Sequence, residues 1–350
     1  MPQTELRNGF TTGSAMCAAA VAAWRGSAEP VELELPGGGR LAIPVAWQKG
    51  HCAAVVKDGG DDPDVTSGCE IVVRLDPFDG GVQESDHQEE GEDLLLVVRG
   101  GEGVGVATRP GLAIAPGKSA INPVPRRMLL RNLAMAGAQG RLLVTVSVPK
   151  GREVAGRTLN PTLGIVGGIS IIGTSGIVRP YSNEAYAATI ALQLRSVAAS
   201  GGRQAAVTTG TRSAAAVARD FPHLPPEAII GIADFIQVAV RAAATAGLQT
   251  LIVACMPGKL FKYACGETNT HAHRSRMSLV RLGEMGVELP GVPLAKMDTM
   301  GELASAIGSA EYAKVLDLVY PVARRVLQEW AGGSLNIVLA LYDETGRRLK

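Results

Sequence analysis

The chain has 350 residues, a net charge of +1 and 46% hydrophobic residues. The near-neutral charge argues against a nucleic-acid-binding protein, which would carry a basic face, and the apolar content argues against disorder. At about 150 residues per domain, the length predicts two domains. The start of the chain shows no apolar signal segment, and no apolar run is long enough for a membrane span. We therefore expect a cytoplasmic protein that binds neither nucleic acid nor membrane.

The first part of the chain, residues 1–150, indicates a mixed α+β domain. An Ala-rich stretch at 15–25 and a second stretch at 122–137 predict helices. The acidic stretch 79–93 predicts an exposed loop. Short strands, separated by Gly, Pro and Asp turns, are expected at 31–35, 41–47, 52–57, 70–75 and 94–99.

Apolar strands alternate with helices in the second part, residues 151–350. Strands are expected at 142–148, 168–173, 204–209, 228–233, 250–255 and 336–342. Helices are expected at 183–199, 212–219, 234–246, 272–285 and 310–331. Uninterrupted apolar strands between helices are typical of a parallel sheet covered on both faces. We predict a Rossmann-like three-layer α/β domain, with the domain boundary near residue 150.

Two polar segments in the first part could hold a ligand. Thr11, Thr12 and Ser14 precede a helix, where free N–H groups and hydroxyls favour an anion, although simple capping explains them as well. The turn 58–64 carries four carboxylates, of Asp58, Asp61, Asp62 and Asp64, which need a cation, backbone donors or solvent. Calcium is conceivable, but the EF-hand pattern is absent. A bound ammonium or sulfonium would suit the turn, and a solvated acidic turn is the alternative.

Arginines and glycines supply further candidates. Arg126 and Arg127 open the helix at 122–137, and their forked side chains suit carboxylates or phosphates, the alternative being a solvated helix face. The glycine-rich run 163–176 predicts a strand that ends in a loop where backbone approaches a nucleotide-type cofactor, or else a buried strand and turn.

A third polar segment, at 269–276, lies in the second part. Its ligand candidates are Asn269, His271 and Arg274, in a loop that could bind anions. The two nearby histidines invite a metal, but only Glu267 could complete the site, so we expect no metal bound by the protein itself. A capped, solvated helix start is the alternative.

Six stretches, in this order, resemble the cobalt-precorrin-5B C1-methyltransferase (CbiD) family. They are RNGFTTGS at 7–14, KDGGDDPDVT at 57–66, GEGVG at 101–105 with PG at 110–111, INPVPRRM at 121–128, LNP at 159–161 and GIVGGISIIGTSGIV at 164–178. The match is looser at 258–271. Gln237 and Val238 follow Asp234 where the family has small or acidic residues, which weakens a ribose-binding role for that helix start. The loop 255–259 also differs from the family pattern.

The resemblance implies transfer of a methyl group from S-adenosylmethionine to C-1 of cobalt-precorrin-5B, in the oxygen-independent route to cobalamin. Cobalt would arrive with the corrinoid substrate. The transfer is an in-line displacement that depends mainly on alignment. As the methyl group leaves sulfur, positive charge moves to the macrocycle, and a carboxylate nearby would stabilise it.

We assign candidate roles on this basis. Catalytic carboxylates are expected among Asp58, Asp61 and Asp62. The methyl donor is expected at Gly167, Gly168, Gly173, Thr174 and Ser175. The carboxylates of the substrate are expected at Thr11, Thr12, Ser14, Arg126, Arg127, Asn269, His271 and Arg274.

Two other functions remain open from the residues alone. A nicotinamide-dependent oxidoreductase could use the same α/β half, although the G-x-G-x-x-G motif is missing. A non-catalytic corrinoid-binding protein would bind the macrocycle without a methyl donor. A homodimer is the default expectation for an enzyme of this size.

Overall fold

The computed structural model describes residues 6–271, 277–333 and 335–350. The chain divides into two compact units, Met1–Ser182 and Asn183–Lys350, each with its own apolar core. The predicted boundary near residue 150 is therefore corrected. Residues 151–182 belong to the first unit because β11 (Ile165–Val166) pairs with β9 (Val106–Ala107), and β12 (Ile177–Val178) pairs with β1 (Gly9–Phe10).

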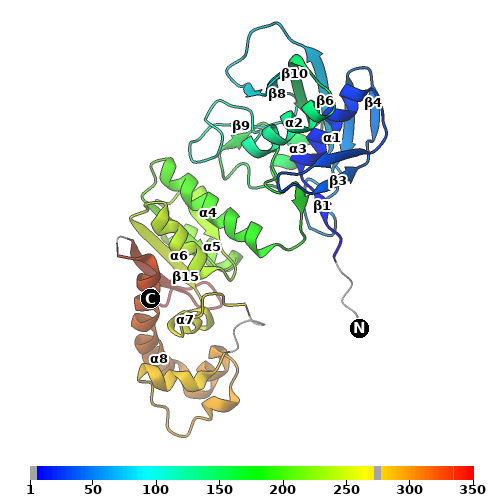
Figure 1. Cartoon of the computed structure of the whole chain (residues 1–350). Coiled ribbons are helices and arrows are strands. Elements are labelled where there is room, and N and C mark those ends of the chain that lie inside the picture. The colour runs from blue at the N-terminus through cyan, green and yellow to red at the C-terminus, as the bar shows by residue number, and fades with distance from the viewer. Residues whose placement is uncertain (1–5, 272–276, 334) are drawn as a thin grey trace. The chain divides into compact units, whose positions relative to one another are not determined.

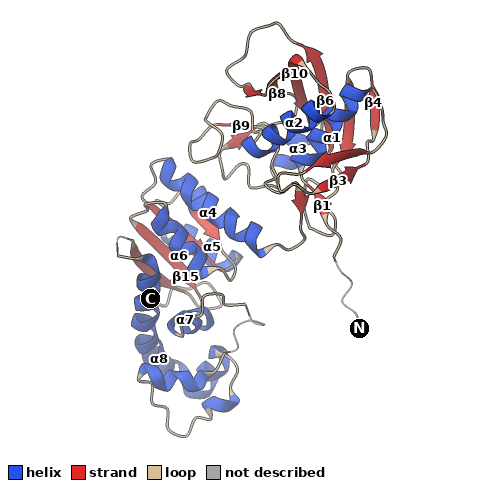
Figure 2. Ribbon diagram, viewed as in Figure 1, coloured by secondary structure: helices blue, strands red, loops and turns tan. Residues whose placement is uncertain are grey.

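The first unit is built on a six-stranded sheet in the order β4-β5-β6-β10-β8-β7, seen in Figure 2. All neighbours are antiparallel except β10 and β8, which run parallel. The bounds are β4 Trp47–Lys49, β5 Cys52–Val56, β6 Glu70–Pro77, β7 His87–Glu90, β8 Leu94–Gly100 and β10 Gly140–Ser147. The strand β7 corrects the loop expected at 79–93. Its His87 is buried although its sequence, HQEE, is polar throughout.

Helix α1 (Thr12–Arg25) fills the core of this unit. Residues 12–23 are all buried, because alanine side chains let the helix lie close to β5 and β6. Gly26 ends the helix in the left-handed conformation. The helix packs against α2 (Pro123–Met135) and against β2 (Val31–Glu34), which forms a hairpin with β3 (Arg40–Ile43). The short helix α3 (Gly151–Ala155) belongs to the same unit.

The second unit holds a fully parallel sheet of four strands in the order β14-β13-β15-β16. These are β13 (Gln204–Thr208), β14 (Ile229–Gly231), β15 (Thr250–Cys255) and β16 (Asn336–Leu341). Two strands expected in this sheet belong to the first unit. The strand expected at 142–148 is β10 of the six-stranded sheet. In the stretch 168–173, Ile169 and Ile171 make only isolated bridges, to Val104 and Ile121.

Helices surround this sheet (Figure 1). They are α4 (Asn183–Ala199), α5 (Thr211–Asp220), α6 (Ile236–Thr245), α7 (Pro257–Ala264) and α8 (Met300–Ala331). The chain passes from β13 through α5 to β14, then turns back through α6 to β15 on the other side of β13. Right-handed crossovers in opposite directions place α5 and α6 on opposite faces. Helix α6 packs against α4 and α8.

The connections of the second unit contain short 3-10 turns at Pro226–Ala228, Leu279–Met285 and Leu294–Lys296. The helix expected at 272–285 is thus a 3-10 turn from Leu279, and residues 272–276 lie outside the described part. Among the described residues, none of the helices combines the length and the apolar character needed to cross a membrane.

Candidate functional site

Residues 7–14 bring together three of the segments singled out in the sequence. The backbone N–H of Phe10 donates to the carbonyl of Asp58 at 2.8 Å, on one side of the segment. On the other side, Thr11 N donates to Gly176 O at 3.1 Å and Gly13 N donates to Ile172 O at 2.9 Å. The segment therefore lies between the acidic turn and the glycine-rich loop.

The hydroxyls at the start of α1 are already hydrogen-bonded inside the protein. Thr11 Oγ1 accepts from Ser14 N at 3.1 Å, and Ser14 Oγ donates to Gly176 O at 2.7 Å. Thr12 Oγ1 accepts from Ile172 N at 2.9 Å. All three residues are at most 8% exposed. Their geometry matches helix capping and fastening of the loop at 172–176.

The four carboxylates of the acidic turn are held in two ways. Two of them meet cations: Asp58 accepts a forked contact from the guanidinium of Arg7, and Asp64 contacts Lys57 Nζ at 2.5 Å. The other two accept from backbone: Asp61 from Arg7 N at 2.6 Å, and Asp62 from Tyr181 N at 3.0 Å. These contacts relieve the repulsion between the carboxylates of the turn.

Electrostatics keep this turn ionised. The hydrogen bond from Arg7, with one from Gly60 N, lowers the pKa of Asp58. Burial acts against ionisation of Asp64, but hydrogen bonds from Lys57 and Thr66 outweigh it, so the pKa of Asp64 is also lowered. Asp58 and Asp64 are therefore held in their ionised form, each against its cationic partner.

The glycine-rich loop has a packing role that the sequence did not reveal. A Cβ on Gly173 would lie 2.3 Å from Thr11 Oγ1, and one on Gly168 would lie 2.1 Å from the carbonyl oxygen of Gly103. Ser175 Oγ donates to Ile177 O at 3.1 Å. A Cβ on Gly167 would meet no atom within 4 Å, but its φ of +83° favours glycine there. Thr174 makes no side-chain hydrogen bond within the described residues. The argument that this loop ends a strand of the parallel sheet is wrong, since the loop belongs to the first unit.

The two predicted arginines of α2 differ in their exposure to solvent. Arg126 is largely buried and its Nε lies 3.1 Å from Glu89 Oε1, whereas Arg127 is exposed. Burial is the main cause that lowers the pKa of Arg126. Arg127 is therefore the one whose guanidinium is open to a ligand.

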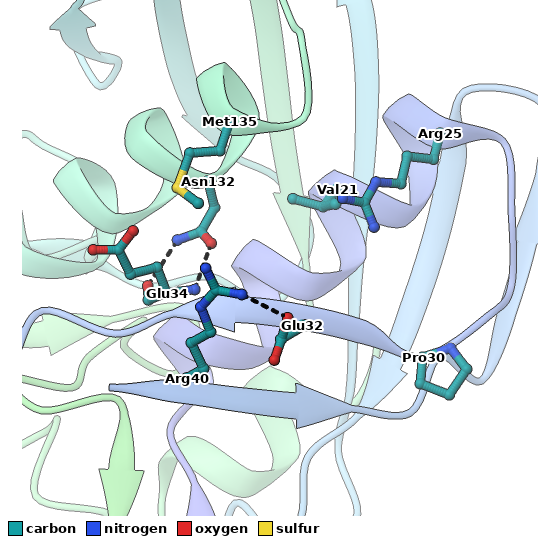
Figure 3. A pocket seen from close by; sticks show the side chains of 8 residues that line it. All are labelled: Val21, Arg25, Pro30, Glu32, Glu34, Arg40, Asn132 and Met135. Atoms are coloured by element: carbon teal, nitrogen blue, oxygen red, sulfur yellow. Dashed lines mark hydrogen bonds and ion pairs between the residues drawn. The ribbon is translucent and has the colours of Figure 1, made fainter. Parts of the chain in front are cut away.

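A cavity of about 270 Å³ lies at the other end of α2. In Figure 3, Arg40 reaches Glu32, and the Asn132 amide bridges the backbone of Glu34. Its remaining lining residues are Val21, Arg25, Pro30 and Met135. None of the residues predicted from the sequence lines it.

The second unit contains a polar cluster whose residues were not predicted as site residues from the sequence. Asp234 follows β14, and its Oδ1 contacts Lys259 Nζ from α7 and accepts from Thr270 Oγ1 at 2.8 Å. Lys259 also donates to Thr270 Oγ1 at 2.7 Å. The available signal was an aspartate placed directly after a buried apolar strand.

The loop at 269–271 adjoins this cluster. Asn269 Oδ1 accepts from the N–H of His271 at 3.0 Å, and Thr270 N donates to Asp234 O at 3.1 Å. Asn269 therefore caps its own loop, while His271 is exposed. Arg274 lies outside the described residues.

Comparison with known proteins identifies the relatives of the chain. The family model named CbiD matches residues 1–180. The cobalt-precorrin-5B C(1)-methyltransferase of Nitratidesulfovibrio vulgaris is 39% identical, over 98% of this chain and 92% of the relative. The protein of that name from Methylococcus capsulatus is 40% identical, over 98% of this chain and 85% of the relative.

A solved structure is also similar, the cobalamin biosynthesis protein CbiD of Archaeoglobus fulgidus. It is 27% identical, covers 77% of this chain and 83% of its own, and superposes with a TM-score of 0.41. With a family model that spans the first 180 residues and relatives that match nearly the whole length, the chain belongs to the CbiD family of cobalt-precorrin-5B C(1)-methyltransferases.

Proposed function

We propose that this chain is the enzyme that methylates cobalt-precorrin-5B at C-1, giving cobalt-precorrin-6A, with S-adenosylmethionine as the methyl donor. The observation that supports this most is the identity of 39% over 98% of the chain to a cobalt-precorrin-5B C(1)-methyltransferase. The match covers both compact units. Cobalt enters as part of the corrinoid substrate.

Methyl transfer from a sulfonium needs alignment and charge stabilisation more than an acid or a base. We propose that the acidic turn supplies the negative charge that stabilises the cationic macrocycle. Among its carboxylates, Asp61 and Asp62 accept only backbone N–H groups within the described residues. The Arg7 charge attracts Asp61 without a side-chain hydrogen bond to it, so both carboxylates are neutralised less than Asp58. Asp58 is partly neutralised by Arg7, so we assign it a supporting part.

The anionic side chains of the substrate need cationic donors. Arg127 is our leading candidate because its guanidinium is exposed, while Arg126 is engaged with Glu89. A guanidinium can bind a carboxylate through two parallel hydrogen bonds. The buried hydroxyls of Thr11, Thr12 and Ser14 are better suited to fixing the backbone around the acidic turn.

We further propose that the second unit is a Rossmann-like domain. Its four parallel strands follow the order β14-β13-β15-β16, with a reversal of direction at β13. Open sheets of this kind bind ligands at the carboxyl ends of strands where the order reverses.

The test of the function is anaerobic incubation of the full chain with cobalt-precorrin-5B and S-adenosylmethionine. The expected result is a corrinoid product heavier by one methylene group, together with stoichiometric S-adenosylhomocysteine. Absence of both products, with a folded protein and authentic substrate, would show that the assigned reaction is wrong. An oxidised or reduced corrinoid formed only with a nicotinamide cofactor would point instead to an oxidoreductase.

A further inference from the structure

The second unit has a topological switch point at β13. This strand lies between β14 and β15, and the connections that leave β13 and β15 pass to opposite faces of the sheet. Divergent connections leave a crevice outside the carboxyl ends of the strands, where nucleosides and their phosphates bind in such folds. Asp234, in the turn after β14, lies at this edge of the sheet.

The backbone at the edge is open. A Cβ on Gly210, which follows β13, would meet no atom within 4 Å, and the same holds for Gly231 at the end of β14. Between Gly231 and Asp234, Ala233 adopts a φ of +45°, a conformation that residues other than glycine rarely adopt. Such strained residues concentrate at ligand sites, where the surrounding structure holds them in place.

The Asp234 carboxylate is fixed on one side and available on the other. Lys259 and Thr270 both contact Oδ1. Within the described part of the chain, Oδ2 has no protein partner and the side chain is 20% exposed. A fixed carboxylate with one free oxygen is suited to accept hydrogen bonds from the vicinal hydroxyls of a ribose.

An aromatic pair lies next to this carboxylate. The rings of Tyr186 and Phe235 are 5.3 Å apart, and the Tyr186 hydroxyl donates to Gly231 O at 3.3 Å. Tyr186 is 40% exposed. The two rings are tilted by 37° to each other, so a purine base would pack against the exposed ring of Tyr186 beside Asp234 rather than across both rings.

We infer that Asp234 binds the ribose of the adenosine portion of the methyl donor, with Tyr186 and Phe235 on the side of the base. The inference rests on the proposed function, because that function names the adenosine ligand. Nucleotide-binding domains of this topology place an acidic residue about 20 residues after the first Gly-containing turn, on the ribose hydroxyls. Gly210 and Asp234 have a similar spacing, and Asp234 itself supplies the acidic side chain that the sequence lacks at Gln237 and Val238. We thus propose the methyl donor at Asp234 instead of at the loop 167–175. In that loop, Gly168 and Gly173 are required by close packing within the first unit.

The experiment compares two nucleosides that differ by a single hydroxyl. The full-length protein is titrated calorimetrically with 5′-methylthioadenosine and with its 2′-deoxy counterpart. For the wild type, we expect the deoxy compound to bind about tenfold or more weakly, because a hydrogen bond to a charged group is lost. In Asp234→Ala, the two compounds should bind equally.

Three further variants test whether the effect is specific to the Asp234 carboxylate. Asp298→Ala removes an exposed carboxylate from the same unit and should keep the wild-type ratio. Asp234→Asn retains an oxygen acceptor for Lys259 and Thr270, so it should fold like the wild type and still reduce the ratio. Tyr186→Ala should weaken both nucleosides by the same factor. Thermal denaturation of each variant checks that it is folded.

The possible outcomes distinguish failure of the ribose site from failure of the proposed methyltransferase function. Equal binding of the two nucleosides by the wild type, an unchanged ratio in both Asp234 variants, or no binding of either nucleoside would overturn the ribose site. Methyl transfer accompanied by any of those results would leave the methyltransferase standing without this site. A clear ratio in a protein that transfers no methyl group would keep the nucleoside site and remove the proposed reaction.

Discussion

Individual carboxylates in the acidic turn differ in what surrounds their charge. Asp58 and Asp64 contact Arg7 and Lys57, whereas Asp61 and Asp62 accept from backbone N–H groups. The sequence could show the density of carboxylates, but it could not rank them. Two of the donors lie far away along the chain: Arg7 is 51 residues from Asp58, and Tyr181 is 119 residues from Asp62.

The first prediction concerns Asp61→Asn, which keeps an oxygen to accept from Arg7 N and removes the charge. We expect kcat to fall about tenfold with little change in KM, less than in an enclosed site because Asp61 is exposed. Steady-state methyl transfer measures this. Asp79→Asn, which neutralises an exposed acid elsewhere in the first unit, is the matched control. Equal kcat values for the Asp61 variant and the wild type would remove Asp61 from the charge-stabilising role.

The second prediction separates the two arginines of α2. Arg127→Ala should raise the KM for the corrinoid about tenfold through loss of a forked contact, while its melting temperature stays unchanged. Arg126→Ala should instead cost about 2 kcal/mol of unfolding free energy, because Glu89 loses its buried partner. Kinetics and urea unfolding of both variants test the distinction, with the exposed Arg152→Ala as control. A large KM effect in Arg126→Ala alone would reverse the assignment.

Secondary structure elements were predictable where the hydrogen bonds are local or the apolar pattern is long. The helix expected at 183–199 is α4, and the strands expected at 250–255 and 336–342 are β15 and β16. The apolar run 168–173 misled the prediction because its partners are not in a sheet: they are residues near 104 and 121 and the start of α1. Strand β7 was missed because its buried residue is a histidine.

The third prediction concerns the contact between the segment 7–14 and the acidic turn. A Cβ on Gly9 would lie 2.2 Å from the carbonyl carbon of Gly59, and neither segment can retreat without losing the backbone pairing to Asp58. Gly9→Ala should therefore cost about 2 kcal/mol of unfolding free energy, as overpacking typically does. Gly37→Ala, in a hairpin turn where a Cβ meets nothing within 4 Å, is the control and should be nearly neutral. Similar unfolding midpoints for the two variants would contradict this close approach.

Across the whole molecule, two separate apolar cores make two unfolding events the natural expectation. The first core contains α1 and the six-stranded sheet, and the second contains the parallel sheet and its helices. Our fourth prediction is that calorimetry of the full chain resolves two transitions and that Gly9→Ala lowers only one of them. A single transition shifted as a whole by this variant would show that the units unfold together.

The fifth prediction is a pH dependence that arises from His87. Burial lowers its pKa to about 4, and its Nε2 lies 2.7 Å from Ser119 O. The unfolded chain has a histidine pKa of about 6.5, so between pH 6.5 and 4 the unfolded state binds the additional proton. Stability should be fully present above pH 6.5 and fall as the pH falls towards 4.

Urea unfolding at pH 7 and pH 5 checks this effect. His87→Gln keeps an N–H donor for Ser119 and should flatten the pH dependence. His223→Gln, at an exposed histidine, should leave the dependence unchanged. An identical slope in the wild type and in His87→Gln would show that other groups cause the acid sensitivity.

The hydrogen bonds between the segment 7–14 and residues 172–176 affect how the chain folds during translation. Ser14 hydrogen-bonds to Gly176, a separation of 162 residues. During synthesis, the start of α1 therefore waits for its partners until nearly the whole first unit has left the ribosome. At about 5–20 residues per second, this delay is on the order of ten seconds or more, while an alanine-rich apolar helix lacks its final neighbours. During this interval the apolar face of the helix is open to any chaperone that binds exposed apolar segments.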